Sequence, residues 1–199
     1  MEYPFDALHA GIESQILNLP AGIPDSQAVT QAQALPDSIE KFLALGKAFS
    51  RTLQSNPAIA DFEKSMSLGA ERLDCLYRIG LAHYYAGRYA QALETFENCM
   101  PLCDEEMGIA VLYWHTLSAV HAEKASTLLK YYRPDMAVGH HTAYEKAMRV
   151  WSGTTPLAAA LEMLEREEDD LEYGITLYGL LWHPDCAYLA AWNDRSRVL

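Results

Sequence analysis

Two small residues, Gly80 and Ala92, and the glycine between them constrain the fold of this chain more than any other feature. Small residues on facing helices let two backbones approach closely, while larger apolar side chains fill the space around the contact. Gly87 lies between the two and can take the left-handed backbone of a tight turn. The larger side chains at helical spacing are Leu76, Tyr89 and Phe96. Residues 73–103 are therefore predicted to form a hairpin of two antiparallel helices.

This segment resembles a tetratricopeptide repeat, whose pattern is W-x2-L-G-x2-Y, then A-x3-F, then proline. The matching positions are Leu76 for Trp, Ile79-Gly80 for Leu-Gly, His83 with Tyr84 for Tyr, and Ala92 and Phe96 for A-x3-F, with Pro101 slightly early. Together the repeat signature is Leu76, Gly80, Gly87, Tyr89, Ala92 and Phe96. The resemblance implies an all-α, helix-hairpin solenoid, in which at least about three hairpins must stack to bury their faces.

Weaker copies of the hairpin are expected on both sides of it. Gly46 and Phe49 suggest one over residues 37–68, and a shift of 33 residues from Gly80 and Ala92 falls on Tyr113 and Ala125. In a third, Tyr178-Gly179 would take the place of Ile79-Gly80. Their apolar residues recur at the spacing of one helix face, with no convincing alternating strand pattern. Helices are expected over about 70–86, 89–102, 106–121, 123–132, 139–151, 156–164, 170–183 and 185–195, besides those within 37–68.

The N-terminal part has a different composition. Phe5, Leu8, Ile12 and Ile16 fall on one helix face, whereas residues 20–36 are rich in Gln, Ala, Ser and Pro. We interpret residues 1–36 as an N-terminal helix plus a linker or weak helix. Residues 37–199 are interpreted as the helical-repeat domain, and Asp37 with Glu40 resembles a capping box at its start.

Charge and composition restrict the partners. The net charge is −12 and the basic residues are scattered, so nucleic acid and anionic membranes are not expected to bind. No stretch approaches the roughly 20 apolar residues of a membrane span, and the start lacks the pattern of a secretory signal. The four cysteines, including Cys99 and Cys103, show no C-x-x-C spacing, which favours reduced thiols in a cytoplasmic protein.

The sequence contains no P-loop, Rossmann glycine pattern, nucleophile elbow or zinc signature, so neither an enzyme nor a cofactor nor a metal is expected. The alternative is an enzyme or small-ligand binder with a pocket between helices. Its candidate residues are His115, His121 and the pair His140 and His141, of which His141 stands four residues before Glu145.

The leading functional hypothesis is a protein–protein interaction module, chaperone-like or a scaffold. In the repeat family the first helix of each hairpin lines a concave groove. By the resemblance, that groove would be formed by Tyr77, Leu81, Tyr84 and Tyr85, and we add Trp114 from the following helix. It would be aromatic and apolar rather than a clamp for a peptide carboxylate, because Tyr77 and Leu81 replace the basic and amide residues of such clamps. An extended or helical segment of another protein, or a second copy of this chain, is the expected partner. The acidic residues 165–170 are a second candidate docking site, for a basic partner.

Overall fold

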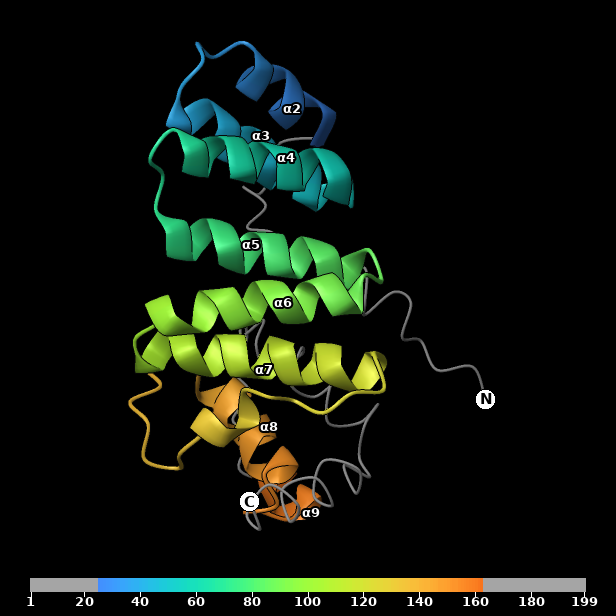
Figure 1. Cartoon of the computed structure of the whole chain (residues 1–199), viewed down its shortest axis with the longest axis vertical. Coiled ribbons are helices and arrows are strands. Elements are labelled where there is room, and N and C mark those ends of the chain that lie inside the picture. The colour runs from blue at the N-terminus through green and yellow to red at the C-terminus, as the bar shows by residue number, and fades with distance from the viewer. Residues whose placement is uncertain (1–24, 163–199) are drawn as a thin grey trace. The chain divides into compact units, whose positions relative to one another are not determined.

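The computed structural model describes residues 25–162, and these contain helices and turns but no strand. This confirms the all-α, helix-hairpin fold class for the described part of the chain (Figure 1). The helices are α2 (Asp25–Gln33), α3 (Ile39–Arg51), α4 (Ser55–Ser67), α5 (Arg72–Tyr85), α6 (Tyr89–Cys99), α7 (Glu105–His121), α8 (Thr142–Trp151) and α9 (Leu157–Glu162), with short 3-10 helices η1 (Met100–Leu102) and η2 (Leu129–Tyr131). Within residues 25–162, no helix is both long and apolar enough to cross a membrane.

The expected helices at 5–16, 170–183 and 185–195 lie outside the described residues. So do Tyr178-Gly179 of the expected third hairpin and the acidic residues 165–170. The chain divides into two compact units whose boundary falls inside α6, after Thr95. We call residues 25–95 unit 1 and residues 96–162 unit 2, and describe each by itself.

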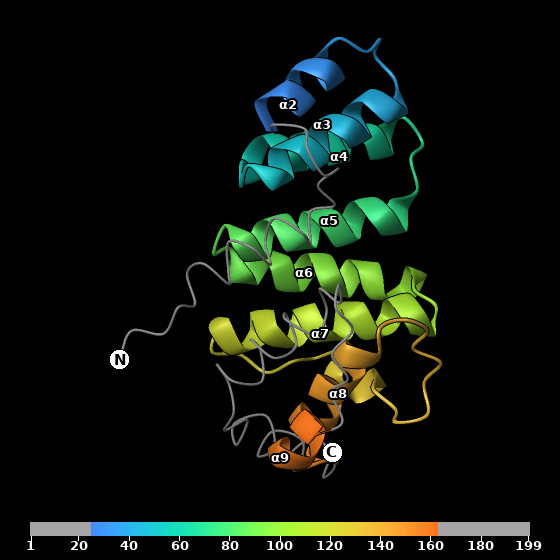
Figure 2. The same cartoon turned by 180° about the vertical axis from the view of Figure 1, so that it is seen from behind.

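In unit 1 each helix packs against the next one along the chain. Both views show α2 on α3, α3 on α4 and α4 followed by α5 (Figures 1 and 2). The segment interpreted as a linker or weak helix therefore contains α2, whose Ala32 is buried. Ser38 rather than Asp37 caps α3, because its side chain accepts from the Lys41 amide at 3.2 Å while Asp37 pairs with the Lys41 ammonium.

The α3–α4 hairpin has the close approach that the sequence predicts near Gly46. The Phe62 ring of α4 is fully buried against this glycine, and a Cβ there would lie 2.6 Å from the ring. Ala58 and Phe62 of α4 form one core cluster with Cys75 and Ile79 of α5. The packing around Phe62 therefore continues from the α3–α4 hairpin into α5.

Residues 73–95 form the expected hairpin in unit 1. Gly80 and Ala92 are buried, Gly87 has a φ of +69°, and the Tyr84 and Tyr89 rings meet edge-on at 5.6 Å across the turn. Leu76 is also buried, and Phe96, the last signature residue, is fully buried at the start of unit 2.

Helix α7 is the core of unit 2 and is buried on all sides from Gly108 to Ala119. The Tyr113 ring stacks on Tyr144 at 4.5 Å and on Trp151 at 5.1 Å, both from α8. Rings stacked at these distances contribute packing energy beyond the apolar area they bury.

The helix expected over 123–132 is wrong. Residues 122–128 form turns and irregular chain, followed only by η2, so Ala125 does not lie in a second repeat helix. Ser126 and Thr127 instead form hydrogen bonds with the side chains of His115 and Glu97, which hold this segment against α6 and α7. The next helix begins at Thr142 rather than near 139.

Replacing Gly46 by Ala should lower the free energy of unfolding by about 1–3 kcal/mol, because the buried Phe62 ring must move to admit a methyl group. Gly108→Ala is the matched control: it is also a buried helical glycine, but a Cβ there would meet only side-chain atoms at 3.7 Å. The control should leave stability unchanged or raise it by up to about 1 kcal/mol. Thermal melting of the two variants checks this, and equal stability losses would contradict it.

Candidate functional site

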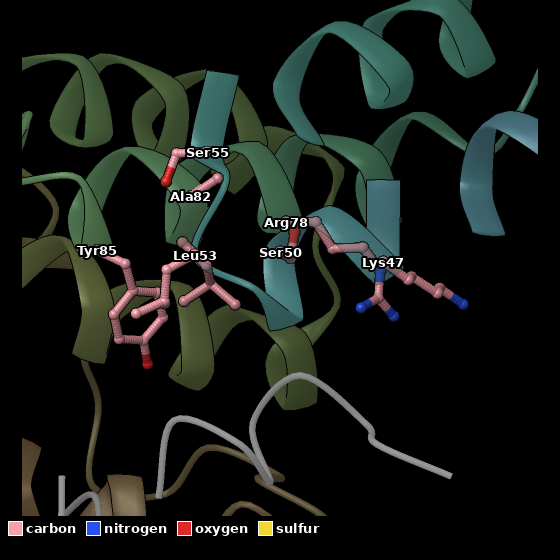
Figure 3. Close-up of a pocket in the computed structure, with 8 residues that line it drawn as sticks. Lys47, Ser50, Leu53, Ser55, Arg78, Ala82 and Tyr85 are labelled. Carbon is pink, nitrogen blue, oxygen red and sulfur yellow. The ribbon is translucent and has the colours of Figure 1, made fainter. Parts of the chain in front are cut away.

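A pocket in unit 1 lies between the end of α3, the start of α4 and one face of α5 (Figure 3). Helix α5 contributes Arg78, Leu81, Ala82 and Tyr85, which recur at the three- and four-residue spacing of one helix face. The other lining residues are Lys47, Ser50, Leu53 and Ser55. The pocket therefore combines the hairpin at 73–95 with the hairpin before it.

The two ends of this pocket differ in chemistry. In Figure 3 the side chains of Lys47 and Arg78 lie at one end, and Leu53 lies beside Tyr85 at the other. Arg78 donates from Nε to Asp74 at 2.8 Å, and Asp74 lies outside the lining. Among the eight described residues that line the pocket there are two cations and no carboxylate, although the whole chain carries a net charge of −12.

Leu53 reaches the pocket from an unusual backbone position. Its φ is +55°, in the left-handed region that residues other than Gly, Asn and Asp rarely enter. Two hydrogen bonds close the end of α3 there: the Leu53 amide donates to Ser50 O at 3.0 Å, and the Gln54 amide donates to Phe49 O at 2.9 Å. This is the common left-handed C-cap, in which glycine is the preferred residue.

The same pair of hydrogen bonds closes the C-terminal ends of α4, α5, α7 and α8. The left-handed residues in these caps are Gly69, Gly87, Glu123 and Gly153. Three of the five caps thus use glycine. At Leu53 the chain instead has a large apolar side chain that is 51% exposed. Strained residues persist where the surrounding structure or a function requires them.

The structure places the expected groove residues in different environments. Leu81 and Tyr85 line the pocket, although Leu81 is buried in its floor. Tyr84 is buried, with its ring edge-on to Tyr85 at 5.5 Å, and Tyr77 is half-buried on α5 but does not line the pocket. Trp114 belongs to unit 2, where it is 2% exposed and its ring meets Tyr113 edge-on.

Sequence reasoning missed Lys47, Ser50, Leu53 and Ser55 as pocket residues. They come from the preceding hairpin, and only the packing of α4 and α5 brings them beside α5. The one local signal was the absence of glycine at the end of α3, where a helix of this kind commonly has one.

His115, a candidate of the alternative reading, lies at the centre of a buried polar network in unit 2. Its Nδ1 is 2.9 Å from Ser126 Oγ, and its Nε2 is 3.4 Å from Thr127 Oγ1 and 3.6 Å from Glu97 Oε1. A serine, histidine and carboxylate in this order have the groups of a hydrolytic triad. However, His115 is fully buried and Ser126 is 2% exposed, so no substrate can reach the hydroxyl in this arrangement.

The protonation of His115 also disfavours a role as general base. Burial lowers the pKa of His115 to about 4, against the opposing effect of Glu97. An imidazole with this pKa is a weak base at neutral pH. The network instead satisfies buried polar groups and fixes residues 126–127 to α7.

The other candidate histidines, His121, His140 and His141, lie in three different environments. Burial lowers the pKa of His121, the last residue of α7. His140 Nδ1 lies 2.6 Å from Glu106 Oε1, and the adjacent His141 is buried at the start of α8. Glu145, the expected helix-face neighbour of His141, bonds Arg149, Lys146 and Tyr132 instead. In the described residues no group of three or more His, Cys, Asp and Glu side chains is placed to hold a metal ion.

No protein-family model, curated protein or solved structure matches this chain. The resemblance of residues 73–103 to a helical repeat therefore depends on their own residues and packing.

Replacing Leu53 by Gly should raise the free energy of unfolding by about 1 kcal/mol, because glycine takes a φ of +55° without strain. Gly69→Ala makes the reverse change at the equivalent cap of α4, where φ is +99° and no atom lies within 4 Å of an added Cβ. It should lower stability by a similar amount. The two melting temperatures give the test, and destabilisation by Leu53→Gly would show that its side chain contributes more packing energy than its backbone costs.

Acid should destabilise unit 2 through His115. The folded-state pKa of about 4 lies below the ordinary value of 6.5, so the unfolded chain binds the proton first as the pH falls. The stability is complete above pH 6.5, and the loss reaches about 2 kcal/mol by pH 5. His115→Gln should reduce this pH dependence between pH 7 and 5, whatever its stability at pH 7. Denaturant unfolding of both proteins at the two pH values measures it, and an unchanged slope would refute the assignment.

Proposed function

We propose that unit 1 is a protein-interaction module whose pocket between α3 and α5 binds a segment of another protein. The observation that carries the proposal is Leu53, a half-exposed leucine in a strained left-handed cap at the edge of a pocket. An exposed apolar side chain adds little to folding, whereas it gains buried area when a partner covers it.

The resemblance to a tetratricopeptide repeat supports this proposal. The family binds partners along the first helix of each hairpin, and α5 is the first helix of the hairpin at 73–95. Leu81 and Tyr85 of the expected groove are among the lining residues. Aromatic side chains beside aliphatic ones are typical of the sites that dominate binding energy.

The charges of the pocket indicate which segment would bind. Lys47 and Arg78 lie at one end, and Asp74 balances only one of these two positive charges. A carboxylate entering the pocket would gain a charge-assisted hydrogen bond from either cation. We therefore propose as occupant a segment with an acidic residue near a large apolar residue. The net charge of −12 would by itself favour a basic partner, but local charges decide contacts within a pocket.

The proposal is tested by measuring how the full chain binds short fluorescent peptides that each contain one Leu or Phe and either Asp/Glu, Asn/Gln or Lys at varied spacing. Acidic peptides should bind at least about tenfold more tightly than their Asn/Gln counterparts. Lys47→Gln should reduce this preference for acidic peptides, because Asp74 already balances the charge of Arg78, the other cation. Leu53→Asn and Tyr85→Ala should weaken the tightest peptide by about tenfold or more. Asparagine tolerates the left-handed backbone, so Leu53→Asn separates binding from folding.

The matched controls remove similar side chains from outside the pocket. Leu68→Asn changes an exposed leucine at the end of α4, and Lys124→Gln changes an exposed lysine of unit 2. Both should bind like the unaltered protein. Binding without preference for acidic peptides would contradict the charge assignment alone, whereas undiminished binding by Leu53→Asn and Tyr85→Ala would contradict the pocket itself.

A further inference from the structure

Two thiols of unit 2 meet at the connection between α6 and α7. Cys99 is the last residue of α6 and is fully buried, and Cys103 follows η1 and is half-buried. Cys103 Sγ lies 3.4 Å from the Cys99 carbonyl oxygen, and the two side chains share a hydrogen bond. Neither thiol takes part in the proposed pocket, which belongs to unit 1.

The short helix η1 places the thiols together. Residues 100–102 form a 3-10 turn containing Pro101, and the Cys103 amide closes it by donating to Met100 O at 3.2 Å. The Cys103 side chain reaches back across this turn to the last residue of α6, where its Sγ donates to the Cys99 carbonyl oxygen. Two thiols must lie side by side in this way before a disulfide can join them. Cys103 itself has an extended backbone, so its side chain is not constrained by the helix.

The two cysteines differ in reactivity. The Cys99 thiol donates to Cys103, which lowers the pKa of Cys103 and raises that of Cys99, where burial adds to the effect. The thiolate is the attacking form, and Cys103 is the more accessible of the two. Cys103 is therefore suited to react first, and Cys99 to react second with the product.

We propose that Cys99 and Cys103 are a redox-active pair that forms an intramolecular disulfide by exchange with a low-molecular-weight disulfide such as oxidised glutathione. The Cys103 thiolate attacks one glutathione sulfur, forming a mixed disulfide and releasing one glutathione thiolate. The Cys99 thiolate then attacks the Cys103 sulfur and releases the second. The two protein thiols lose two electrons and two protons, which reduce one glutathione disulfide to two glutathione thiols.

The test uses the folded full-length protein, treated with oxidised glutathione, alkylated and digested with trypsin without reduction. Cleavage after Arg88 and Lys124 gives a fragment whose only cysteines are Cys99 and Cys103. This fragment should lose the mass of two hydrogen atoms and take up no alkylating agent. The fragment 73–78, which carries the buried Cys75, is the internal control and should contain a free or alkylated thiol.

Two variants establish the order of the steps. In Cys99→Ser, glutathione should remain attached to Cys103, because no second thiol displaces it. In Cys103→Ser, Cys99 should stay reduced. The proposal is overturned if the unaltered protein keeps both thiols, or if its reaction stops with glutathione on Cys103. Glutathione on Cys99 in Cys103→Ser would overturn the assignment of Cys103 as the attacking thiol.

Discussion

The left-handed C-cap is the constraint on which the described fold depends. Five helices end with the same two backbone hydrogen bonds, and each cap lets the chain turn sharply after the last helical residue. In unit 1 these caps follow α3, α4 and α5, so successive helices reverse direction and pack on their neighbours. The pocket is a consequence of this geometry, because the cap of α3 places Leu53 beside the face of α5 that carries Leu81 and Tyr85.

The sequence predicted the turn and the close helix contact that depend on a glycine. Gly87 revealed the turn between α5 and α6, and Gly46 revealed the close contact of α3 with α4. Leu53 and Glu123 take the same left-handed conformation without being glycine, so no glycine marked these two turns in the sequence. The helix expected at 123–132 was wrong for a related reason. Its apolar spacing is helical, but Ser126 and Thr127 bond to His115 and Glu97, and only the tertiary structure places those partners nearby.

The candidate pocket was predictable in part. The repeat resemblance selects one face of α5, which was sufficient to indicate Leu81 and Tyr85. The resemblance could not show that Tyr84 packs against Tyr89 across the turn instead of lining the pocket. Nor could it identify Lys47 and Leu53, because a pocket between two hairpins depends on how they pack. Each end of the pocket thus combines a residue that follows from spacing along α5, Tyr85 or Arg78, with one that follows from packing, Leu53 or Lys47.

Unit 1 and unit 2 use aromatic and polar side chains for different purposes. In unit 2 the rings of Tyr113 and Trp151 are stacked and fully buried, and His115 is held neutral within a satisfied network. The rings stabilise the unit through buried and stacked apolar surface, and the polar atoms of His115 have partners within the folded chain. In unit 1 the side chain of Leu53 remains half-exposed at a position where its backbone is strained, and two cations lie at the other end of the same pocket. The strained backbone of Leu53 costs stability in the isolated chain, and burial of its side chain by a bound segment would offset that cost. This difference is why we propose the binding function for unit 1 rather than for the larger aromatic cluster of unit 2.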